Sequence, residues 1–381
     1  MYQALKVMSF LIACSYPLMS KSFTYRRFIW MSTKSIVFLG TPDVVASTVL
    51  KTLHSVSTQN NKFIISAAVT QPPAISGRKK QLVKSPVHTL AESLSIKVFY
   101  PEKANDPVFL EELEKLSPDL CITAAYGNYL PKKFLSIPKL GTINIHPSLL
   151  PAYRGAAPIQ RCLENGDSET GVTILETVSK MDAGPILYQY KQALNGHETS
   201  TQMLHDMFTI GTKELIGLLP SVFDGSAVRV EQNEALVTFA NKLNMSEARV
   251  DFSVHDALTV HNRLRGFADW PGVWTAFQIY DSAADSVFED NIRIKMITTV
   301  VLQPASSPLL ATPASLDLDA RTVLLEKDPV HGYLLRVRCA RGSVLGVTHV
   351  QPSGKKVMPV RDYMNGLRGN KLLWTVPPLD S

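Results

Sequence analysis

The chain contains 381 residues, of which 45% are hydrophobic and 19% are charged, and its formal net charge is +6 at pH 7. This length allows two domains, each with its own hydrophobic core, and the composition is typical of a soluble globular protein. The positive charge permits a polyanionic partner such as a nucleic acid, although a basic enzyme would carry it equally well.

Cysteine spacing and the length of the apolar runs exclude several classes of protein. The four cysteines are scattered without a CxxC pair, which argues against a disulfide framework and against a zinc site. They are Cys14, Cys121, Cys162 and Cys339. Beyond the amino terminus no apolar run reaches the roughly 18 residues that span a bilayer, so we expect no membrane partner.

Residues 1–34 have the composition of a targeting segment. No Asp or Glu occurs before Asp43, whereas basic and hydroxyl-bearing residues are frequent. The basic residues are Lys6, Lys21, Arg26, Arg27 and Lys34. This composition predicts an organellar transit peptide, most simply for the mitochondrial matrix, with the plastid as an alternative. Two other interpretations stay open: a secretory signal with an apolar core at 7–14, and a translation start at Met31.

From residue 35 onward, short apolar runs alternate with helical patterns. Strands are predicted at 35–39, 63–70, 120–125 and 142–146, and helices up to residue 53 and at 85–94. This alternation predicts an α/β fold with an open, largely parallel, Rossmann-like sheet that binds ligands at the carboxyl ends of its strands. The turn at Gly40 lacks the G-x-G-x-x-G pattern, so we expect a tight strand-to-helix turn there and no dinucleotide site.

After about residue 220 the pattern changes to short alternating strands separated by turns. These strands are predicted at 292–297, 323–325, 333–337 and 344–350. Their spacing predicts a smaller, OB-like β-barrel. Between residues 331 and 371 this domain carries eight Lys and Arg against Asp362 alone, which indicates either a solvated basic face or a nucleic-acid surface. The predicted domains are a targeting segment (1–34), a catalytic domain (35–225), a linker (226–246) and a barrel (247–381).

Three polar residues in one short stretch supply the groups needed for acyl transfer. Asn144 and His146 lie two apart on a predicted strand and therefore share one face. Asp182 follows in a loop from which its carboxylate could reach the imidazole, although it could equally cap its own loop. An amide, an imidazole and a carboxylate can stabilise an oxyanion and move a proton, but their spacing leaves the reaction open.

The wording of this stretch resembles the folate-dependent formyltransferases. The matching motifs are Asn-x-His at 144–146, Ser-Leu-Leu-Pro at 148–151 and Asp-x-Gly at 182–184. Within that superfamily the chain is most similar to the methionyl-tRNA formyltransferases. The segments that carry this likeness are 40–43, 70–72, 153–160, 240–243, 247–249, 270–271 and 351–356. The resemblance runs from about residue 35 to residue 368 and includes both predicted domains.

The resemblance implies transfer of the formyl group of 10-formyltetrahydrofolate to the amino group of methionine on initiator tRNA. Asn144 and His146 would stabilise the oxyanion, and Asp182 would orient His146 and help to remove the proton from the attacking ammonium. No metal is expected. The residues expected to hold the folate are Ala125, Tyr126, Gly127, Ser148, Leu149, Leu150 and Pro151.

The resemblance also implies a tRNA surface that includes a basic loop within 72–85. The residues expected to contact tRNA are Arg78, Lys79, Lys80, Lys84, Arg154, Lys355 and Lys356. On composition alone, the loop lysines could simply be exposed to solvent. The loop departs from the usual wording, since Pro73 and Ala74 replace a common Asp-Arg pair and Lys79 replaces a glycine. We expect a monomer that binds initiator methionyl-tRNA.

Three rival functions remain. A formyltransferase acting on a small amine, such as glycinamide ribonucleotide or an amino sugar, would need neither the basic loop nor the basic barrel. A formylfolate hydrolase would use the same site with water as the acceptor. An inactive RNA-binding module would have no need for Asn144, His146 and Asp182 together.

Overall fold

The computed structural model describes residues 33–41, 44–76, 81–302 and 321–375. Residues 1–32 of the predicted targeting segment, and the predicted tRNA contacts Arg78, Lys79 and Lys80, lie outside the described residues. Among the helices that are described, none is long and apolar enough to cross a membrane.

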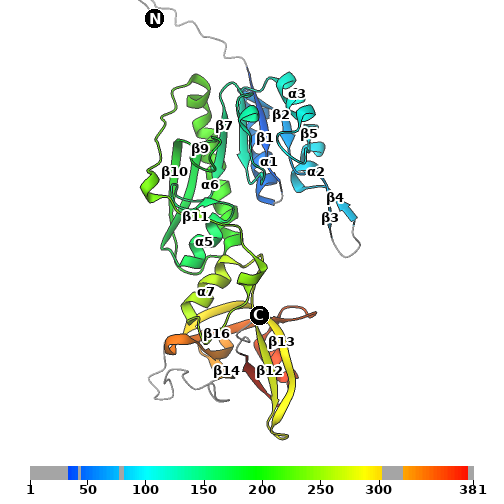
Figure 1. The fold of residues 1–381 in the computed structure, drawn as a ribbon, viewed down its shortest axis with the longest axis vertical. Helices are drawn as coiled ribbons and strands as arrows, with labels where there is room; N and C mark the ends of the chain where they lie inside the picture. Colours follow the sequence, from blue (N-terminus) through cyan, green and yellow to red (C-terminus); the bar gives the residue numbers. More distant parts are fainter. Residues whose placement is uncertain (1–32, 42–43, 77–80, 303–320, 376–381) are drawn as a thin grey trace, which may run out of the picture. The chain divides into compact units, whose positions relative to one another are not determined.

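Within the described residues, seven strands form the first sheet in the order β10-β9-β7-β6-β1-β2-β5 (Figure 1). Their bounds are β1 (Lys34–Leu39), β2 (Phe63–Val69), β5 (Lys97–Phe99), β6 (Leu120–Ala124), β7 (Thr142–His146), β9 (Glu169–Glu176) and β10 (Ile186–Ala193). The neighbours from β5 to β7 pair in parallel, and β9 and β10 extend the sheet antiparallel. The predicted open, largely parallel sheet is confirmed. Strands β5, β9 and β10 were not predicted.

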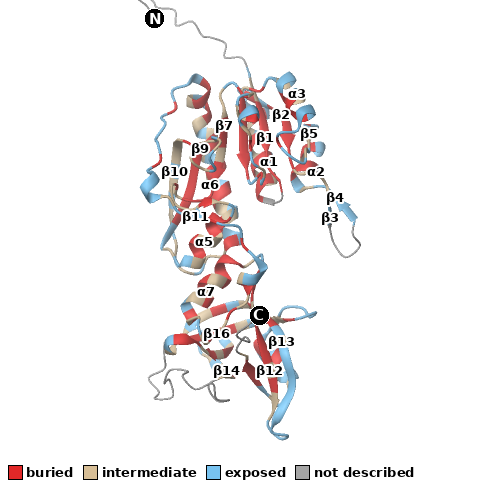
Figure 2. Ribbon diagram, viewed as in Figure 1, coloured by how far each residue is buried: buried red, intermediate tan, exposed pale blue. Residues whose placement is uncertain are grey.

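Helices cover both faces of this sheet. They are α1 (Val44–Asn60), α2 (Pro86–Ser93), α3 (Pro107–Leu116), α4 (Lys132–Leu135), α5 (Pro158–Asn165) and α6 (Ser200–Asp224). On one face, Leu50 of α1 and Leu215 of α6 belong to the same buried cluster as Ile145 of β7. On the other face, Leu110 of α3 packs in a cluster with Val37 of β1. Figure 2 shows the central strands as buried.

The first strand turns tightly into α1 at Gly40, as the sequence predicts. A Cβ atom at this glycine would lie 2.8 Å from the Phe38 ring and 2.9 Å from both the Ala124 carbonyl oxygen and the Ala46 Cβ. The turn is therefore packed against β6 too closely for any side chain. This packing brings the carboxyl ends of β1 and β6 together, where strand order reverses and doubly wound sheets bind ligands.

The second sheet is antiparallel throughout the described residues and has the order β13-β12-β18-β14-β15-β16-β17. Its strands are β12 (Val273–Asp281), β13 (Ser286–Leu302), β14 (Thr322–Asp328), β15 (Gly332–Arg338), β16 (Val344–Pro352), β17 (Met358–Pro359) and β18 (Lys371–Trp374). An additional pairing of β13 with β16 closes the sheet into a barrel around Trp374 and Leu345. The predicted barrel is confirmed, although β12, β17 and β18 were not predicted. Helix α9 (Val360–Gly366) and η3 (Ala340–Gly342) complete it.

The segment between the sheets is attached to the catalytic domain along its length. Val230 bridges to Ile186, and β11 (Phe239–Ala240) pairs in parallel with β8 (Arg154–Gly155). The remaining short elements are β3 (Ala74–Ser76), β4 (Gln81–Val83), η1 (Glu234–Leu236), η2 (Met245–Ala248) and α7 (Ala257–Gly266). The stretch that the sequence marks as a linker therefore extends the catalytic domain as far as Ala240.

Candidate active site

The three predicted catalytic residues meet at the carboxyl end of β7. Asn144 and His146 come from this strand, and Asp182 comes from the turn between β9 and β10. One carboxylate oxygen of Asp182 lies 3.5 Å from Asn144 Nδ2, and the other lies 3.7 Å from His146 Nδ1. The His146 side chain is 5% exposed and that of Asp182 is 14% exposed, so water has little access to either.

Asn144 is held in one orientation by Thr123 of β6, which is its partner in the register of the two strands. The buried Thr123 hydroxyl donates to Asn144 Oδ1 at 2.7 Å. Because the Asp182 carboxylate only accepts, the amide nitrogen faces it, which leaves its second hydrogen available for a developing oxyanion. Thr123 was not predicted as a site residue. Its only signal in the sequence is a hydroxyl in an otherwise apolar strand.

His146 has a defined basic nitrogen. Its Nε2 lies 3.0 Å from the carbonyl oxygen of Tyr153, which can only accept, so Nε2 carries the hydrogen. In the neutral ring Nδ1 is then the proton acceptor, and it faces the carboxylate of Asp182.

The Asp182 loop is fixed by backbone contacts. Asp182 has a left-handed backbone conformation, with φ of 50°, and its Oδ2 accepts from the Gly155 amide at 2.9 Å. Gly155 has φ of 131°, and a Cβ atom there would lie 2.6 Å from the Ala240 carbonyl oxygen. Only glycine fits between the carboxylate and β11.

The structure does not support the predicted contact of Arg154 with tRNA. The Arg154 side chain is 0% exposed, and Nη2 donates to Glu234 Oε1 at 2.8 Å. Nε and Nη2 also donate to Gln232 Oε1. Gln232 and Glu234, which precede β11 in the chain, surround this arginine. Its guanidinium group is therefore bound inside the protein.

The three predicted folate residues that directly follow β6 differ in their exposure. Ala125 and Gly127 are exposed and have positive φ angles of 50° and 80°. Tyr126 between them is buried in the cluster with Phe109 and Phe134, and this burial raises the pKa of its hydroxyl. A Cβ atom at Gly127 would have Gln71 Nε2 as its nearest neighbour, at 4.0 Å, so no atom is packed tightly against this glycine.

The predicted folate loop at 148–151 is half buried. Ser148 and Leu150 lie in the interior, whereas Leu149 and Pro151 are partly exposed. Thr173 of β9 pins the loop, since its hydroxyl donates to the Ser148 carbonyl at 2.7 Å and accepts from the Leu150 amide at 3.1 Å. The inward residues therefore shape the loop, and Leu149 and Pro151 are the side chains that a ligand could touch.

The remaining predicted tRNA contacts lie at the surface. Lys84 follows β4 and forms an ion pair with Glu92 at 2.7 Å, and this hydrogen bond lowers the pKa of the Glu92 carboxyl. Lys355 and Lys356 are exposed in the turn between β16 and β17. Strands β3 and β4 pair as a hairpin on either side of the segment that contains Arg78.

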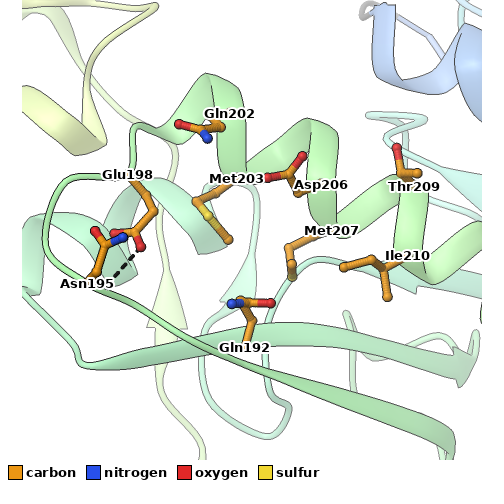
Figure 3. Close-up of a pocket in the computed structure, with 9 residues that line it drawn as sticks. All are labelled: Gln192, Asn195, Glu198, Gln202, Met203, Asp206, Met207, Thr209 and Ile210. Atoms are coloured by element: carbon orange, nitrogen blue, oxygen red, sulfur yellow. Dashed lines mark hydrogen bonds between the residues drawn. The ribbon is translucent and has the colours of Figure 1, made fainter.

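A cavity of about 330 Å³ lies between β10 and α6, and none of the predicted site residues lines it (Figure 3). Its Glu198 carboxylate is already bound by the Asn195 and Gly196 amides. In the described part of the chain, no group of three or more His, Cys, Asp or Glu residues could hold a metal ion.

Two family models match the chain. Residues 34–218 match the formyl transferase model, and residues 242–368 match the carboxyl-terminal domain of formyl transferases. A methionyl-tRNA formyltransferase of Lysinibacillus sphaericus is 34% identical over 89% of this chain and 97% of its own length. That of Macrococcus caseolyticus is 35% identical over 87% of this chain and 96% of its own length.

Solved structures share the fold at lower identity. A HypX variant from Aquifex aeolicus has a TM-score of 0.56 and 16% identity, over 91% of this chain and 49% of its own. An N-formyltransferase from Helicobacter canadensis, solved with folinic acid and dTDP-3-aminofucose, has a TM-score of 0.56 and 15% identity over 84% and 99%. By its sequence relatives and by both of its domains, the chain belongs to the methionyl-tRNA formyltransferase family.

Proposed function

We propose that the chain transfers the formyl group of 10-formyltetrahydrofolate to the α-amino group of methionine on initiator tRNA, for translation initiation in an organelle. The observation that carries this proposal is the convergence of Asn144, His146 and Asp182 in a chain whose relatives are named methionyl-tRNA formyltransferases. Together these residues offer an oxyanion donor, a basic nitrogen and a carboxylate within one site.

The open edge beside this site supports a folate as the formyl donor. The exposed Ala125 and Gly127 and the partly exposed Leu149 and Pro151 flank the carboxyl ends of β6 and β7. Backbone amides and apolar side chains of this kind suit a flat, hydrogen-bonding pteridine ring. The related Helicobacter canadensis structure is described with folinic acid, a formylated folate.

The chemistry requires two proton losses from the acceptor and one proton gain by the donor. With help from Asp182 the ammonium gives one proton to solvent, and the amine lone pair then forms a bond to the formyl carbon. The carbonyl electrons move to oxygen, where the Asn144 amide donates a hydrogen bond. His146 takes the second proton at Nδ1 and delivers it to N10 as the C–N10 bond breaks. The products are N-formylmethionyl-tRNA and tetrahydrofolate.

A second candidate acceptor is a small amine. The Helicobacter canadensis structure contains an amino sugar nucleotide, and its fold resembles this chain. The barrel favours tRNA over this alternative, because it presents Lys355 and Lys356 in an exposed turn that a small acceptor would not need.

Residues 1–34 support an organellar, and most simply a mitochondrial, location through their basic, carboxylate-free composition. A fusion of this segment to a fluorescent reporter is expected to enter mitochondria and to be shortened on import. Entry into plastids would assign the other organelle. Secretion, or no import, would contradict the organellar proposal and leave the catalytic one unaffected.

Formyl transfer by residues 35–381 tests the reaction itself. The donor is 10-formyltetrahydrofolate, and the acceptors are methionyl initiator tRNA, free methionine and a small amino sugar. Formylation of the charged tRNA alone is expected. Transfer only to the small amine or only to water would keep the catalytic residues and overturn the tRNA acceptor.

A further inference from the structure

Both amide hydrogens and the amide oxygen of Gln232 form hydrogen bonds, and two of these bonds go to the Asp182 loop. Its Nε2 donates to the carbonyl oxygens of Asp182 and Gly184, each at 2.8 Å. Its Oε1 accepts from Arg154, from Nε at 3.0 Å and from Nη2 at 2.7 Å. The side chain is 9% exposed. Because carbonyls only accept and guanidinium groups only donate, the amide has one possible orientation.

Arg154 holds the Gln232 side chain by its amide oxygen, at the opposite end from the Asp182 loop. The arginine is 1% exposed and presents two donors to the same Gln232 oxygen. Its charge is balanced by Glu234, which also pairs with Lys180 at 2.6 Å. These two cations lower the pKa of the Glu234 carboxyl, so it stays ionised at neutral pH. Arg154 Nη1 has no partner, but every polar atom of the Gln232 amide is paired, so the Gln232 side chain is held rigidly.

The contact with Asp182 connects this network to catalysis. Asp182 is held through its side chain by the Gly155 amide and through its backbone by Gln232. The left-handed conformation of Asp182 aims the carboxylate at Asn144 and His146, and a displacement of about 1 Å in such a group costs on the order of a hundredfold in rate. We propose that Gln232, locked by Arg154, is a positioning residue that sets the Asp182 carboxylate for formyl transfer. This inference rests on the proposed function for its assay.

The position of Gln232 in the chain makes the inference specific. It lies between the two ranges matched by the family models, 34–218 and 242–368, in the segment that joins the domains. The bridge at Val230 and the pairing of β11 fix this segment on both sides of Gln232. A residue of the connecting segment therefore holds the backbone of the Asp182 loop.

The test is the substitution Gln232→Glu in the otherwise complete chain. The new carboxylate keeps an oxygen for Arg154 and adds a charge pair, but it places an oxygen against the Asp182 and Gly184 carbonyls. We expect kcat for formylation of methionyl-tRNA to fall about 10- to 100-fold with the KM for tRNA unchanged. Gln192→Glu, on β10, is the matched control and is expected to keep the activity of the unaltered chain.

Two further measurements separate positioning from general damage. In single-turnover assays, adding Gln232→Glu to Asp182→Asn is expected to reduce the rate less than twofold, because the residue through which it acts is already impaired. Amide hydrogen exchange at residues 180–186 is expected to quicken in Gln232→Glu but not in Gln192→Glu.

The outcomes distinguish this inference from the proposed function. Unchanged kcat or unchanged exchange in Gln232→Glu overturns the positioning role. Equal losses in both Asp182 backgrounds also overturn it, since Gln232 would then act independently of Asp182. If the unaltered chain formylates only a small amine, the tRNA proposal fails, and the same comparisons are made with that amine.

Discussion

Each of the three proposed catalytic side chains is oriented by a residue that is not itself expected to touch the substrate. Thr123 fixes the Asn144 amide, the Tyr153 carbonyl fixes the His146 ring, and the Gly155 amide fixes the Asp182 carboxylate. Such prior orientation means that little reorganisation is needed when charge develops on the formyl oxygen.

Removing the proton-handling groups should affect turnover rather than binding. Asp182→Asn and His146→Ala are each expected to lower kcat by several orders of magnitude, because both act on the transition state. Binding of methionyl-tRNA, measured by filter retention, should stay close to that of the unaltered chain. Parallel losses of binding and rate would indicate a structural role instead.

The orientation of Asn144 can be tested through Thr123. Thr123→Val removes the hydroxyl at almost constant volume and frees the amide to rotate. We expect kcat to fall about tenfold, which corresponds to about 1.4 kcal/mol of transition-state stabilisation. Thr170→Val, at a buried threonine of β9, is the control. Equal activity in the two variants would show that the Asn144 amide does not depend on Thr123.

The sequence indicated the three residues that meet in the site, but it did not indicate the residues that orient them. Asn144, His146 and Asp182 could be recognised because their motif is local in the chain. Thr123 and Gln232 act through the register of two strands and through the return of a distant segment. Burial of Arg154 was also missed, because a basic residue beside a glycine gives no indication that β11 will cover it.

At the scale of elements, α7 links the barrel to the catalytic domain. Arg263 of α7 forms an ion pair with Glu164 of α5 at 3.1 Å. His261 lies two residues earlier in the same helix, where Nδ1 is 2.9 Å from the Thr299 hydroxyl of β13 and Nε2 is 3.3 Å from the Gly196 carbonyl. The helix therefore contacts the catalytic domain and the barrel together.

Acid should weaken this junction. Burial lowers the pKa of His261 below its ordinary value, and the nearby charges of Arg265 and His197 act in the same direction. The unfolded chain thus binds a proton at higher pH than the folded one, so this stability is present above about pH 6.5 and is lost as the pH falls below it. The melting temperature of His261→Gln should therefore drop less between pH 7.5 and pH 5.5 than that of the unaltered chain. Identical drops would exclude His261 as the titrating group.

Strands were predicted correctly where the hydrophobic pattern is continuous, and they were missed at the edge of the sheet. Strands β1 and β6 are largely apolar and buried, β7 alternates two isoleucines with polar residues, and all three were predicted within one or two residues. Strand β10 alternates between partly buried and exposed positions at the edge of the sheet, which leaves a weaker signal. The predicted limit of the catalytic domain at residue 225 rested on helix-ending residues, whereas the chain continues along that domain to Ala240.

At the scale of the whole molecule, the proposed reaction needs the positive charge of the barrel to bind the tRNA phosphates. Lys355→Ala combined with Lys356→Ala is expected to raise the KM for tRNA while kcat at saturation stays unchanged. The dependence of log(kcat/KM) on log salt concentration should become shallower by about 2, one for each lost phosphate contact. Lys51→Ala with Lys62→Ala removes equal charge from exposed positions near α1 and should leave this slope unchanged. Equal slopes in both double variants would place the tRNA elsewhere.

The pairing of β11 with β8 also determines how the gene can be divided. A fragment that ends at residue 225 retains every residue of the catalytic motif but lacks Gln232 and the strand that covers Gly155. Such a fragment would contain the whole motif but would have low formyl-transfer activity. A fragment extended through Asn241 keeps the hydrogen bonds that hold the Asp182 loop. Exchanging barrels between relatives should therefore join the two parents after this strand, so that each catalytic half keeps its own connecting segment.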